Sequence, residues 1–503
     1  MSIENSEITT IMKLRLLFHQ YYSENPQSID IPERIHTREF AIQWWENNWR
    51  CRKHTKLDDV GNKIQVGCGQ SGKSFKPITK CPNCGSKDIS ITKWTRHGGY
   101  KSKEDLLRNL STIAPHSIYH SAAFYGFPTA ISMNEKEWLG AELVFDIDAD
   151  HLELKCANDH DTWKCKNPDC NETGTGKAPE ICPKCGDNWY CINPNCDVQQ
   201  IISTDEPPKN CPKCESKPSR KLFGFHTRKW ICKECLNTAR RHTIKLYDEF
   251  LTNDLGFDPD NIQINYSGHR GYHIRVHDPK VYKLDSNARM EIVQYVMGSG
   301  FRGSKVIVSQ AGSNIIPARD IPGWSGKLAD AMIEFIQNLS SYTGREKWVN
   351  ILRDKKNPTR LTVKGEAAVK MFERHRPILS AKVKGISLNS WQEIAERAVE
   401  LYGSEIDKPV THDIHRVIRL IGSLNGKTGF VVSELTRDGL DSFKPFSDAV
   451  VFHEGTLKVR FHKGPIPEFI IDDEKYGPYK GGSVELPMAA AVFVLGKEVA
   501  LLE

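Results

Sequence analysis

The stretch ELVFDIDADHLELKCANDH, residues 142–160, determines how the rest of the chain is interpreted. Its first half predicts a buried β-strand that ends in two aspartates, Asp146 and Asp148, with one isoleucine between them. Because side chains alternate along a strand, both carboxylates point to one face while Phe145 and Ile147 pack behind it. Two carboxylates on one face repel each other unless a cation lies between them, and their oxygen atoms suit Mg²⁺ or Mn²⁺. The pair is therefore a candidate site for two-metal chemistry; the alternative is two surface acids at a strand end.

The length and composition of the chain are those of a globular protein of two or three domains. Of its 503 residues, 39% are hydrophobic, and no run of about 18 apolar residues occurs, so we expect no membrane span. The N-terminal segment mixes acidic and basic residues and has no signal-peptide core, which favours an intracellular location, in the cytoplasm or nucleoid. The net charge of +6 fits a polyanionic partner without requiring one.

Fifteen cysteines in a chain of this kind favour metal sites over disulfides. Four C-x-x-C pairs begin at Cys81, Cys182, Cys211 and Cys232, and each pair can supply two of the four ligands of a tetrahedral zinc ion. Each pair then needs two further ligands elsewhere in the chain. The rival interpretation, scattered buried cysteines, does not predict such pairing.

The remaining ligands can be assigned so that no cysteine is left over. The same spacing occurs twice in residues 165–214, which predicts two tandem zinc ribbons. In the N-terminal site, His54 could replace one of the two cysteines that precede the C-x-x-C pair. The four predicted zinc sites are Cys51, Cys68, Cys81 and Cys84; Cys156, His160, Cys232 and Cys235; Cys165, Cys170, Cys182 and Cys185; and Cys191, Cys196, Cys211 and Cys214.

The segment GCGQSGKS, Gly67 to Ser74, matches the phosphate-loop pattern of nucleoside triphosphatases. Such a loop must open a helix whose N-terminal amides face the phosphates. Here Pro77 and the cysteine pair at Cys81 follow too soon for a helix to start, and Cys68 is needed as a zinc ligand. We therefore reject the triphosphatase assignment and expect a solvated tip between two ribbon arms.

Residues 264–278, INYSGHRGYHIRVHD, predict two apolar strands joined by a tight glycine turn. The turn presents Ser267, His269 and Arg270, and His273 follows on the second strand. Backbone amides, a hydroxyl group and an arginine suit the oxygen atoms of a triphosphate. The alternative is that the hairpin is only a solvated basic edge.

Residues 410–430, VTHDIHRVIRLIGSLNGKTGF, form a third cluster. Asp413 is expected to begin a short amphipathic helix that carries Arg416 and Arg419, and Lys427 lies in the loop that follows. A third carboxylate would complete a two-metal site, and the basic residues can hold phosphates. With no obvious proton-transfer base, the three clusters together predict nucleotidyl transfer.

The motifs FDID, SGHRGYH and D…R…GSLNGKTG, in this order, strongly resemble the catalytic small subunit of the archaeal and eukaryotic replicative DNA primase. TREFAI, residues 37–42, resembles the R-E-F signature of that family, and the resemblance runs from about residue 10 to the C-terminus apart from the cysteine-rich inserts. It implies catalytic roles for Asp146, Asp148 and Asp413, triphosphate contacts from Ser267, Arg270, His273 and Arg419, and a place near the active site for Glu39.

The family also carries a zinc site that begins with a Cys and a His after its D-x-D strand and ends in C-x-x-C before a helix. Cys156, His160, Cys232 and Cys235 resemble that site. The tandem ribbons and the N-terminal zinc site are departures from the family pattern. So are Asn425, where the family usually has a histidine, and His269, where some members have an arginine.

The resemblance implies an α/β fold with a mixed-sheet primase–polymerase catalytic core, a helical accessory subdomain and zinc-ribbon inserts. We expect the following organisation: the first half of the core in 1–155 with a zinc insert at about 50–95, the zinc module in 156–235, core again in 236–285, the helical subdomain in 286–375, and completion of the core with a C-terminal helix in 376–503.

The predicted function is synthesis of short primers de novo on a single-stranded DNA template from nucleoside triphosphates, with Mg²⁺ or Mn²⁺ at the aspartates and Zn²⁺ in the cysteine sites. The resemblance implies a primase large subunit as partner in a heterodimer. Two alternatives remain: a primase–polymerase of repair or damage tolerance, and a non-catalytic zinc-ribbon adaptor that binds nucleic acid. Three converging carboxylates argue against the adaptor.

Overall fold

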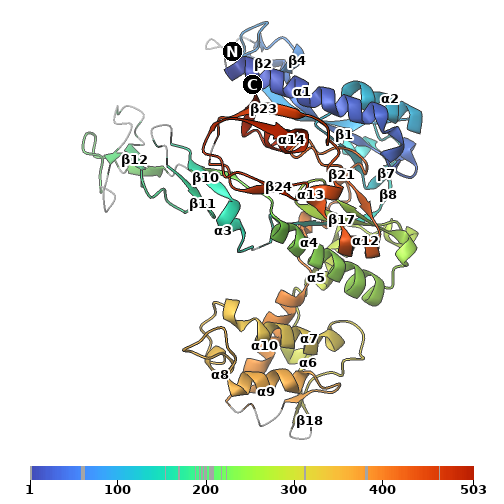
Figure 1. Cartoon of the computed structure of the whole chain (residues 1–503), viewed down its shortest axis with the longest axis vertical. Coiled ribbons are helices and arrows are strands. Elements are labelled where there is room, and N and C mark those ends of the chain that lie inside the picture. Colours follow the sequence, from blue (N-terminus) through green and yellow to red (C-terminus); the bar gives the residue numbers. More distant parts are fainter. Residues whose placement is uncertain are drawn as a thin grey trace.

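The computed structural model describes residues 3–503 and divides them into a large α/β core, a smaller helical unit and projecting cysteine-rich segments (Figure 1). It leaves out residues 58–62, 153, 168–169, 171, 187, 192, 194–195, 197–200, 203–208, 217, 222–223, 311–312, 380–382, 384 and 464. Among the helices that it describes, none is long and apolar enough to cross a membrane.

The first sheet of the core has five strands. They are β1 (Phe40–Cys51), β4 (Ser71–Ser74), β5 (Ile89–Gly98), β6 (Ser117–Ser121) and β21 (Val417–Arg419). The long strand β1 pairs with β4, β5 and β6, and β21 extends the sheet beyond β6. The phosphate-loop lookalike is thus no helix start. Its second half is strand β4, so the expectation of a solvated tip is wrong there.

The second sheet has the order β22–β16–β17–β9. Its strands are β9 (Leu143–Asp148), β16 (Ile262–Tyr266), β17 (Gly271–Val276) and β22 (Glu434–Leu435). The predicted hairpin is confirmed, because β16 and β17 pair around the turn at residues 267–270. β9 pairs with β17 in a register that sets Asp146 opposite His273 and Asp148 opposite Gly271. This register determines which side chains share the face of the aspartates.

The α/β class is confirmed, but the expected mixed sheet is not found. Every strand pair in the described ranges is antiparallel. Parallel neighbours need a crossover connection, whereas β16 and β17 are joined by a tight hairpin. The remaining strands of the core are β7 (Ala123–Tyr125), β8 (Trp138–Ala141), β23 (Thr456–Phe461), β24 (Phe469–Ile471), β25 (Glu474–Tyr476), β26 (Gly482–Pro487) and β27 (Ala500–Leu502).

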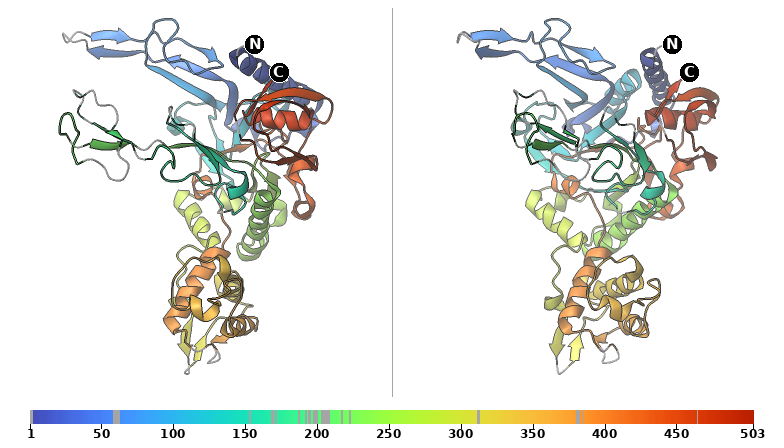
Figure 2. Two further views of the ribbon diagram at one scale, coloured as in Figure 1. Left: turned by 60° about the vertical axis from the view of Figure 1, so that its left-hand side comes forward. Right: turned by 90° about the vertical axis from the view of Figure 1, so that its left-hand side faces the viewer.

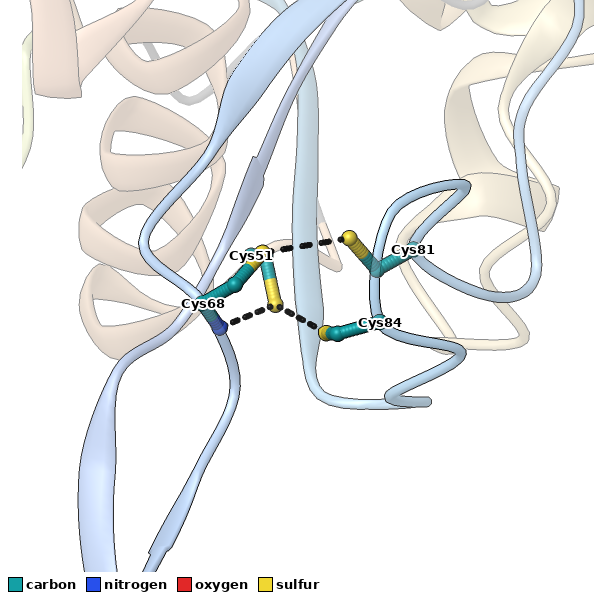
Figure 3. Close-up of side chains that lie close together, drawn as sticks. All are labelled: Cys51, Cys68, Cys81 and Cys84. Carbon is teal, nitrogen blue, oxygen red and sulfur yellow. Dashed lines mark hydrogen bonds between the residues drawn. The ribbon is translucent and has the colours of Figure 1, made fainter.

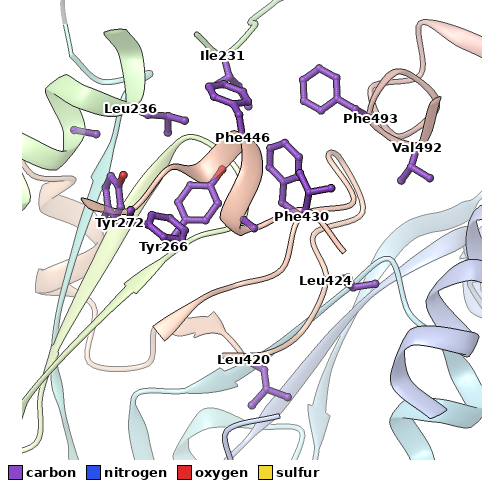
Figure 4. Packing of buried hydrophobic residues seen from close by; sticks show 14 of the residues in the cluster. Ile231, Leu236, Tyr266, Tyr272, Leu420, Leu424, Phe430, Phe446, Val492 and Phe493 are labelled. Carbon is purple, nitrogen blue, oxygen red and sulfur yellow. The ribbon is translucent and has the colours of Figure 1, made fainter. Parts of the chain in front are cut away.

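One large hydrophobic cluster holds the core together (Figure 4). Aromatic side chains from both halves of the chain meet in it: Phe18 lies 6.1 Å from Phe452, and Trp230 lies 6.2 Å from Phe493, centroid to centroid. Phe145 and Ile147 belong to it, as expected for the strand face opposite the aspartates. The core helices are α1 (Ile3–Glu24), α2 (Lys103–Ile113), α4 (Lys233–Lys245, continued as a π-helix over Leu246–Asp254), α5 (Ser286–Val296), α11 (Lys408–His412), α12 (Arg437–Ser442), α13 (Pro445–Asp448) and α14 (Met488–Gly496).

The helical unit at the bottom of Figure 1 has a hydrophobic cluster of its own. It contains α6 (Gly303–Val306), α7 (Trp324–Gln337), α8 (Val349–Leu352), α9 (Val363–Phe372) and α10 (Leu388–Tyr402), with short strands β18 (Val308–Gln310), β19 (Ser313–Ile315) and β20 (Ile378–Leu379). The buried face of α10 belongs to this cluster, whereas Val293 and Val296 of α5 belong to the core. The unit therefore begins and ends later than the predicted range 286–375.

Two cysteine-rich segments project from one side of the core (Figure 2). The first carries β2 (His54–Leu57) and β3 (Lys63–Val66), which form a hairpin. The second carries α3 (Ala157–His160), β10 (Thr162–Cys165), β11 (Thr173–Thr175), β12 (Asn188–Cys191), β13 (Ile201–Ile202), β14 (Pro218–Lys221) and β15 (Phe225–Arg228), arranged as two small three-stranded sheets. This repeated architecture agrees with the tandem unit that the cysteine spacing predicts.

Candidate active site and metal centres

A cavity of about 340 Å³ lies between the two sheets of the core. We call it the catalytic cavity. It brings together residues of three distant segments that sequence analysis singled out, and it adds several that sequence analysis missed. Its lining includes Asp146, Asp148, Ser267, His269, His273, Asp413, Arg416 and Arg419 from the first group and Trp94, Arg96 and Tyr119 from the second.

The two aspartates of β9 are crowded. Burial, reinforced by the negative charges of Asp148 and Asp407, raises the pKa of Asp146 to about 7, although Arg416 and Arg419 oppose this. Asp407 was not predicted; its backbone N–H donates to the carbonyl oxygen of Asp146 at 2.8 Å. Carboxylates that resist ionisation in this way are stabilised by a bound cation, so the donor set fits divalent metal ions.

Asp413 faces the same cavity, but the local structure differs from the expectation. Helix α11 ends at His412, Asp413 is its C-cap residue, and strand β21 follows, so no helix begins here. The side chain of Asp413 accepts a hydrogen bond from the backbone N–H of His415 at 2.9 Å. An aspartate that bonds its own backbone two residues further on forms a turn in place of a helix. Arg416 and Arg419 therefore come from a turn and a strand.

The glycine turn between β16 and β17 is built around Ser267. Its hydroxyl oxygen accepts from the backbone N–H groups of His269 (3.4 Å) and Gly271 (3.3 Å). Gly268 has a φ of +71°, and a Cβ atom at this position would lie 3.0 Å from the Cβ of Asn425. Glycine is thus required both by the backbone conformation and by the close approach of the neighbouring loop.

That neighbouring loop, residues 422–429, is tied to the turn by side chains. Asn425 is buried; its Nδ2 donates to the carbonyl oxygen of Ser267 at 3.3 Å, and its Oδ1 accepts from the N–H of Lys427 at 3.0 Å. The hydroxyl of Thr428 donates to the carbonyl of Gly268 at 2.6 Å. Asn425 therefore acts here as a connector of the two loops.

Both histidines of the turn region are neutral. Burial and the charges of Arg419, Arg275 and Arg416 lower the pKa of His273 to about 3. Its Nδ1 accepts from the side-chain amide of Asn265 at 3.2 Å, so the ring proton lies on Nε2, which is 3.6 Å from Asp146. Burial also holds the pKa of His269 well below its usual range. Neither ring adds positive charge near the aspartates, and His273 can donate a hydrogen bond.

Arg270 and Lys427 lie on the far side of His269 and line a second, adjoining cavity. A side-chain nitrogen of Arg270 is bonded to Asp150, and its Nε is 3.7 Å from Asp148. The predicted phosphate-binding residues are therefore divided between two cavities that share the wall at His269.

Glu39 is fully buried and does not itself line the catalytic cavity, but its partner Arg96 does. It binds the guanidinium group of Arg96 through two hydrogen bonds of 2.8 and 3.0 Å, and the ammonium group of Lys136 lies 3.6 Å away. Burial favours the protonated acid, but the hydrogen bonds and charge of Arg96 lower the pKa of Glu39 below its usual value. Arg96 also donates to the carbonyl of His415 at 3.1 Å, next to the turn of Asp413.

An aromatic wall faces the aspartates. The ring centroids of Trp94 and Tyr119 are 4.5 Å apart, and the guanidinium group of Arg419 lies 4.8 Å from the centroid of Tyr119. The two rings are tilted by 45°, and aromatic and guanidinium groups arranged in this way can hold a base or a sugar. Neither Trp94 nor Arg96 stands out in the sequence, because β5 (ISITKWTRHG) alternates polar and apolar residues as an ordinary strand does. Tyr119 lies on β6. Only the pairing of β5 and β6 with β1 reveals the position of these side chains.

The cysteine clusters fit tetrahedral metal coordination. In a tetrahedron with metal–sulfur bonds of about 2.3 Å, the sulfur atoms are about 3.8 Å apart. In the N-terminal cluster, the Sγ atoms of Cys51 and Cys84 are 3.6 Å apart, and so are those of Cys68 and Cys81 (Figure 3). Four cysteines thus complete this cluster; the side chain of His54 lies outside the described residues.

A second cluster consists of Cys156, His160, Cys232 and Cys235. The Nε2 of His160 is 3.2 Å from the sulfur of Cys235, and its Nδ1 bonds Asp161 at 2.9 Å. A carboxylate behind a histidine in this way orients the ring of a metal ligand. Cys232 also caps the N-terminus of α4, which packs on β17.

The tandem units contain the other two clusters. Cys165, Cys170, Cys182 and Cys185 lie together, with Sγ–Sγ distances of 3.6 and 3.8 Å for the pairs across the site. Cys196, Cys211 and Cys214 form the last cluster; the side chain of its fourth predicted member, Cys191, lies outside the described residues. The four predicted groupings are thus met wherever their side chains are described.

Comparisons with known proteins agree with this architecture. The sequence model of a family described as DNA primase small subunit matches residues 227–437. The DNA primase small subunit of Methanococcoides burtonii is 30% identical to this chain over 81% of the chain and 88% of the relative. That of Methanothrix thermoacetophila is 31% identical over 80% and 87%. That of Nitrosopumilus maritimus is 27% identical over 98% and 99%.

The matches cover most of the length of each relative. Residues of the motifs that carry the resemblance line one cavity. The chain is an enzyme of the nucleotidyltransferase class and belongs to the DNA primase small subunit family.

Proposed function

We propose that this protein synthesises primers de novo on single-stranded DNA by two-metal nucleotidyl transfer, as the catalytic subunit of a primase. The observation that carries the proposal is the convergence of Asp146, Asp148 and Asp413 on one cavity whose wall is a serine turn suited to phosphates. Family membership supports the reaction class, and the cavity supports the assignment of the individual residues.

The carboxylates of Asp146, Asp148 and Asp413 would hold the divalent ions, which supply Lewis acidity for the attacking hydroxyl and the leaving diphosphate. The hydroxyl group of Ser267, the guanidinium group of Arg419 and the Nε2–H of His273 can each donate to phosphate oxygens. None of these groups needs to move a proton, because the reaction requires charge stabilisation and alignment above all.

The cysteine clusters are proposed zinc sites. Three of the four described groupings contain only cysteine and the other adds one histidine, which is the donor set of structural zinc. A primase large subunit is the proposed partner, and single-stranded DNA and nucleoside triphosphates are the proposed substrates. The name of the relatives, small subunit, implies a second and larger subunit, and this supports the proposed partner.

A template-dependent assay tests the proposal. The purified protein, with Mg²⁺ or Mn²⁺, is given a homopolymeric single-stranded DNA template and the complementary nucleoside triphosphate, with and without an annealed primer. We expect products in both cases and none from Asp148→Asn. Product only with a primer would favour an extending polymerase of the repair type, and no product in either case would overturn the proposal.

A further inference from the structure

Residues 50–95, which we call the N-terminal arm, concentrate the positive charge of the chain. They contain ten lysine and arginine residues against three aspartates, a net charge of +7, whereas the whole chain has a net charge of +6. Four thiolates around one Zn²⁺ in the cluster of Cys51 would subtract two of these charges and still leave the arm strongly positive. A basic segment of this kind favours a polyanionic partner.

The base of the arm is a sheet of the strands β4, β1 and β5, and it has two unlike faces. Directly opposed residues of neighbouring strands share a face. One face, which we call the polar face, consists of Asn48, Arg50, Ser71, Lys73, Ser90 and Thr92. It carries two cations and no carboxylate, whereas Trp49, Ile89 and Ile91 lie on the other face. Arginine and lysine beside hydroxyl and amide groups are the side chains that commonly contact the phosphates and sugars of nucleic acids.

The two cations of the polar face are open to a partner. Arg50 and Lys73 are both exposed, and none of the described carboxylates lies within 4.0 Å of their charged nitrogen atoms. The arm does use ion pairing nearby, since Arg52 lies 3.9 Å from Asp88. Arg50 and Lys73 can therefore bind phosphates without first giving up an ion pair, and each phosphate that they neutralise releases a counterion from the nucleic acid.

Strand β5 connects the polar face to the catalytic cavity. Its residues 89–92 pair with β1 in the arm, whereas Trp94 and Arg96, further along the same strand, line the cavity. The arm projects from the side of the core that also carries the zinc module (Figure 2). A polymer that lies along β5 therefore runs directly from the arm to the cavity.

The contacts of the two cations show how close this connection is. The ammonium group of Lys73 lies 3.9 Å from the ring centroid of Trp44, and the indole N–H of Trp44 donates to the hydroxyl of Thr95, next to Trp94, at 2.9 Å. Arg50 pairs with a residue of β5 four positions from Trp94, which is at most about 13 Å at about 3.3 Å per residue. A few nucleotides of an extended strand are enough to reach both cations from the cavity.

We propose that the polar face of the N-terminal arm binds the sugar–phosphate backbone of the single-stranded template outside the catalytic cavity. The proposal rests on the proposed function for the identity of the strand. It adds a contact that the family resemblance does not imply, because the N-terminal zinc site departs from the family pattern. The residues of the polar face line neither the catalytic cavity nor the cavity beside it. An acidic protein would also match the charge, but the connection through β5 favours a strand that serves the active site.

Fluorescence anisotropy of a labelled oligothymidylate with a 5′-hydroxyl group tests the proposal. It is measured with the zinc-loaded full chain, without Mg²⁺ or Mn²⁺, over a range of salt concentrations. The double variant Arg50→Gln with Lys73→Gln should bind the oligonucleotide about tenfold more weakly than the parent, because two charge-assisted contacts are lost. The slope of log K against log salt should become shallower by about 1.4, since each lost phosphate contact with a single strand removes about 0.7.

The control is the double variant Lys355→Gln with Lys480→Gln, which removes the same charge from exposed lysines outside the arm. It should bind the oligonucleotide as the parent does. Unchanged zinc content and circular dichroism of the arm variant would show that its loss of binding does not come from unfolding.

Equal affinity and equal salt slope of the arm variant and the parent would overturn the proposal. So would a loss no larger than that of the control, or a loss confined to blunt duplex DNA. Loss of binding to an acidic peptide with unchanged binding of oligothymidylate would assign the arm to a protein partner instead. The measurement requires no synthesis, so a failure of the primase assay and a failure of this site are distinguishable.

Discussion

The catalytic cavity and the zinc module, residues 156–235, are stabilised by different interactions. The walls of the cavity are sheets backed by a large hydrophobic cluster, so backbone pairing and burial hold Asp146 and Asp148 in place. The first tandem unit has a hydrophobic cluster that consists mainly of Cys165, Cys170 and Cys182 with Phe225 packed against it. The core is held by strand pairing and burial, whereas the module has cysteine clusters in the place of a core. Removal of metal ions should therefore unfold the module and leave the core folded.

The largest expected effect is the loss of zinc. Elemental analysis should approach four zinc ions per chain, one for each cysteine grouping. Binding of a structural zinc ion contributes about 10–16 kcal/mol to folding, so a chelator should unfold the module while the core stays folded. Limited proteolysis would show cleavage confined to residues 156–235 and to the N-terminal cysteine segment around residues 51–84. A content near one zinc ion per chain, or cleavage throughout the chain, would contradict the prediction that metal ions stabilise the module and not the core.

Two cysteine variants sharpen this prediction as a matched pair. Cys182→Ser and Cys232→Ser should each remove about one zinc ion. Cys182 lies in a projecting unit, so extension of an annealed primer should persist. Cys232 caps α4, which packs on β17 beside the aspartates, so its loss should reduce extension as well. Equal primer extension by the two variants would show that the cluster of Cys232 does not support the active site.

Next in size is the loss of a carboxylate from the proposed site of the divalent ions. Asp146→Ala or Asp148→Ala should lower the rate of nucleotide addition at least about a thousandfold, since the ions can no longer be held, while the fold remains. Single-turnover extension of an annealed primer measures this effect. Asp441→Ala, at an exposed aspartate, is the control and should extend normally. Near-normal extension by either site variant would exclude the two-metal assignment.

A smaller effect concerns stability and pH. The pKa of Asp146 is raised to about 7, so the folded state binds its proton more tightly than the unfolded chain does. The contribution of Asp146 to the free energy of unfolding is therefore full at low pH and is lost as pH rises through about 7. Without divalent ions near pH 8, Asp146→Asn should be more stable than the parent by about 2–4 kcal/mol, with little difference near pH 4. Denaturant unfolding of both proteins at the two pH values measures this, and a pH-independent difference would contradict it.

The smallest effect is expected at Glu39, which acts through Arg96. Glu39→Gln should raise KM for the nucleoside triphosphate by about tenfold with a smaller change in kcat, because a neutral amide holds the guanidinium group less firmly. The control is Glu46→Gln, on the same strand and paired with Arg15 at 3.1 Å. A change confined to kcat, or an equal change in the control, would show that Glu39 does not position Arg96.

Local patterns predicted the parts of the site that depend on short stretches of chain. Asp146 and Asp148 share a face because strand periodicity decides it, and the turn at Ser267 follows from its glycines. The helix expected at Asp413 is wrong, because the aspartate bonds the N–H of His415 and so ends a helix instead of starting one. The rest depends on tertiary structure: nothing near Trp94 in the sequence indicates that it lines the same cavity as the aspartates.

The domain boundaries likewise depend partly on local sequence patterns and partly on tertiary contacts. The cysteine groupings could be counted from the sequence because a metal site needs a fixed number of ligands. The extent of the helical unit could not, since α5 and α10 are both amphipathic and either could pack on either cluster. Only the contacts of Val293 with the core and of Trp391 with the helical unit assign them.

The chain leaves the core after Asp150 and returns at Lys229, whose ammonium group donates to the carbonyl of Asp150 at 3.2 Å. Departure and return therefore lie side by side, and the contact between them does not depend on how much polypeptide runs between them. We expect that sequence can be lengthened or shortened in the tandem units without moving the aspartates of β9, provided that Cys156, His160, Cys232 and Cys235 still meet. The tandem units are therefore the place where a fluorescent reporter should be attached.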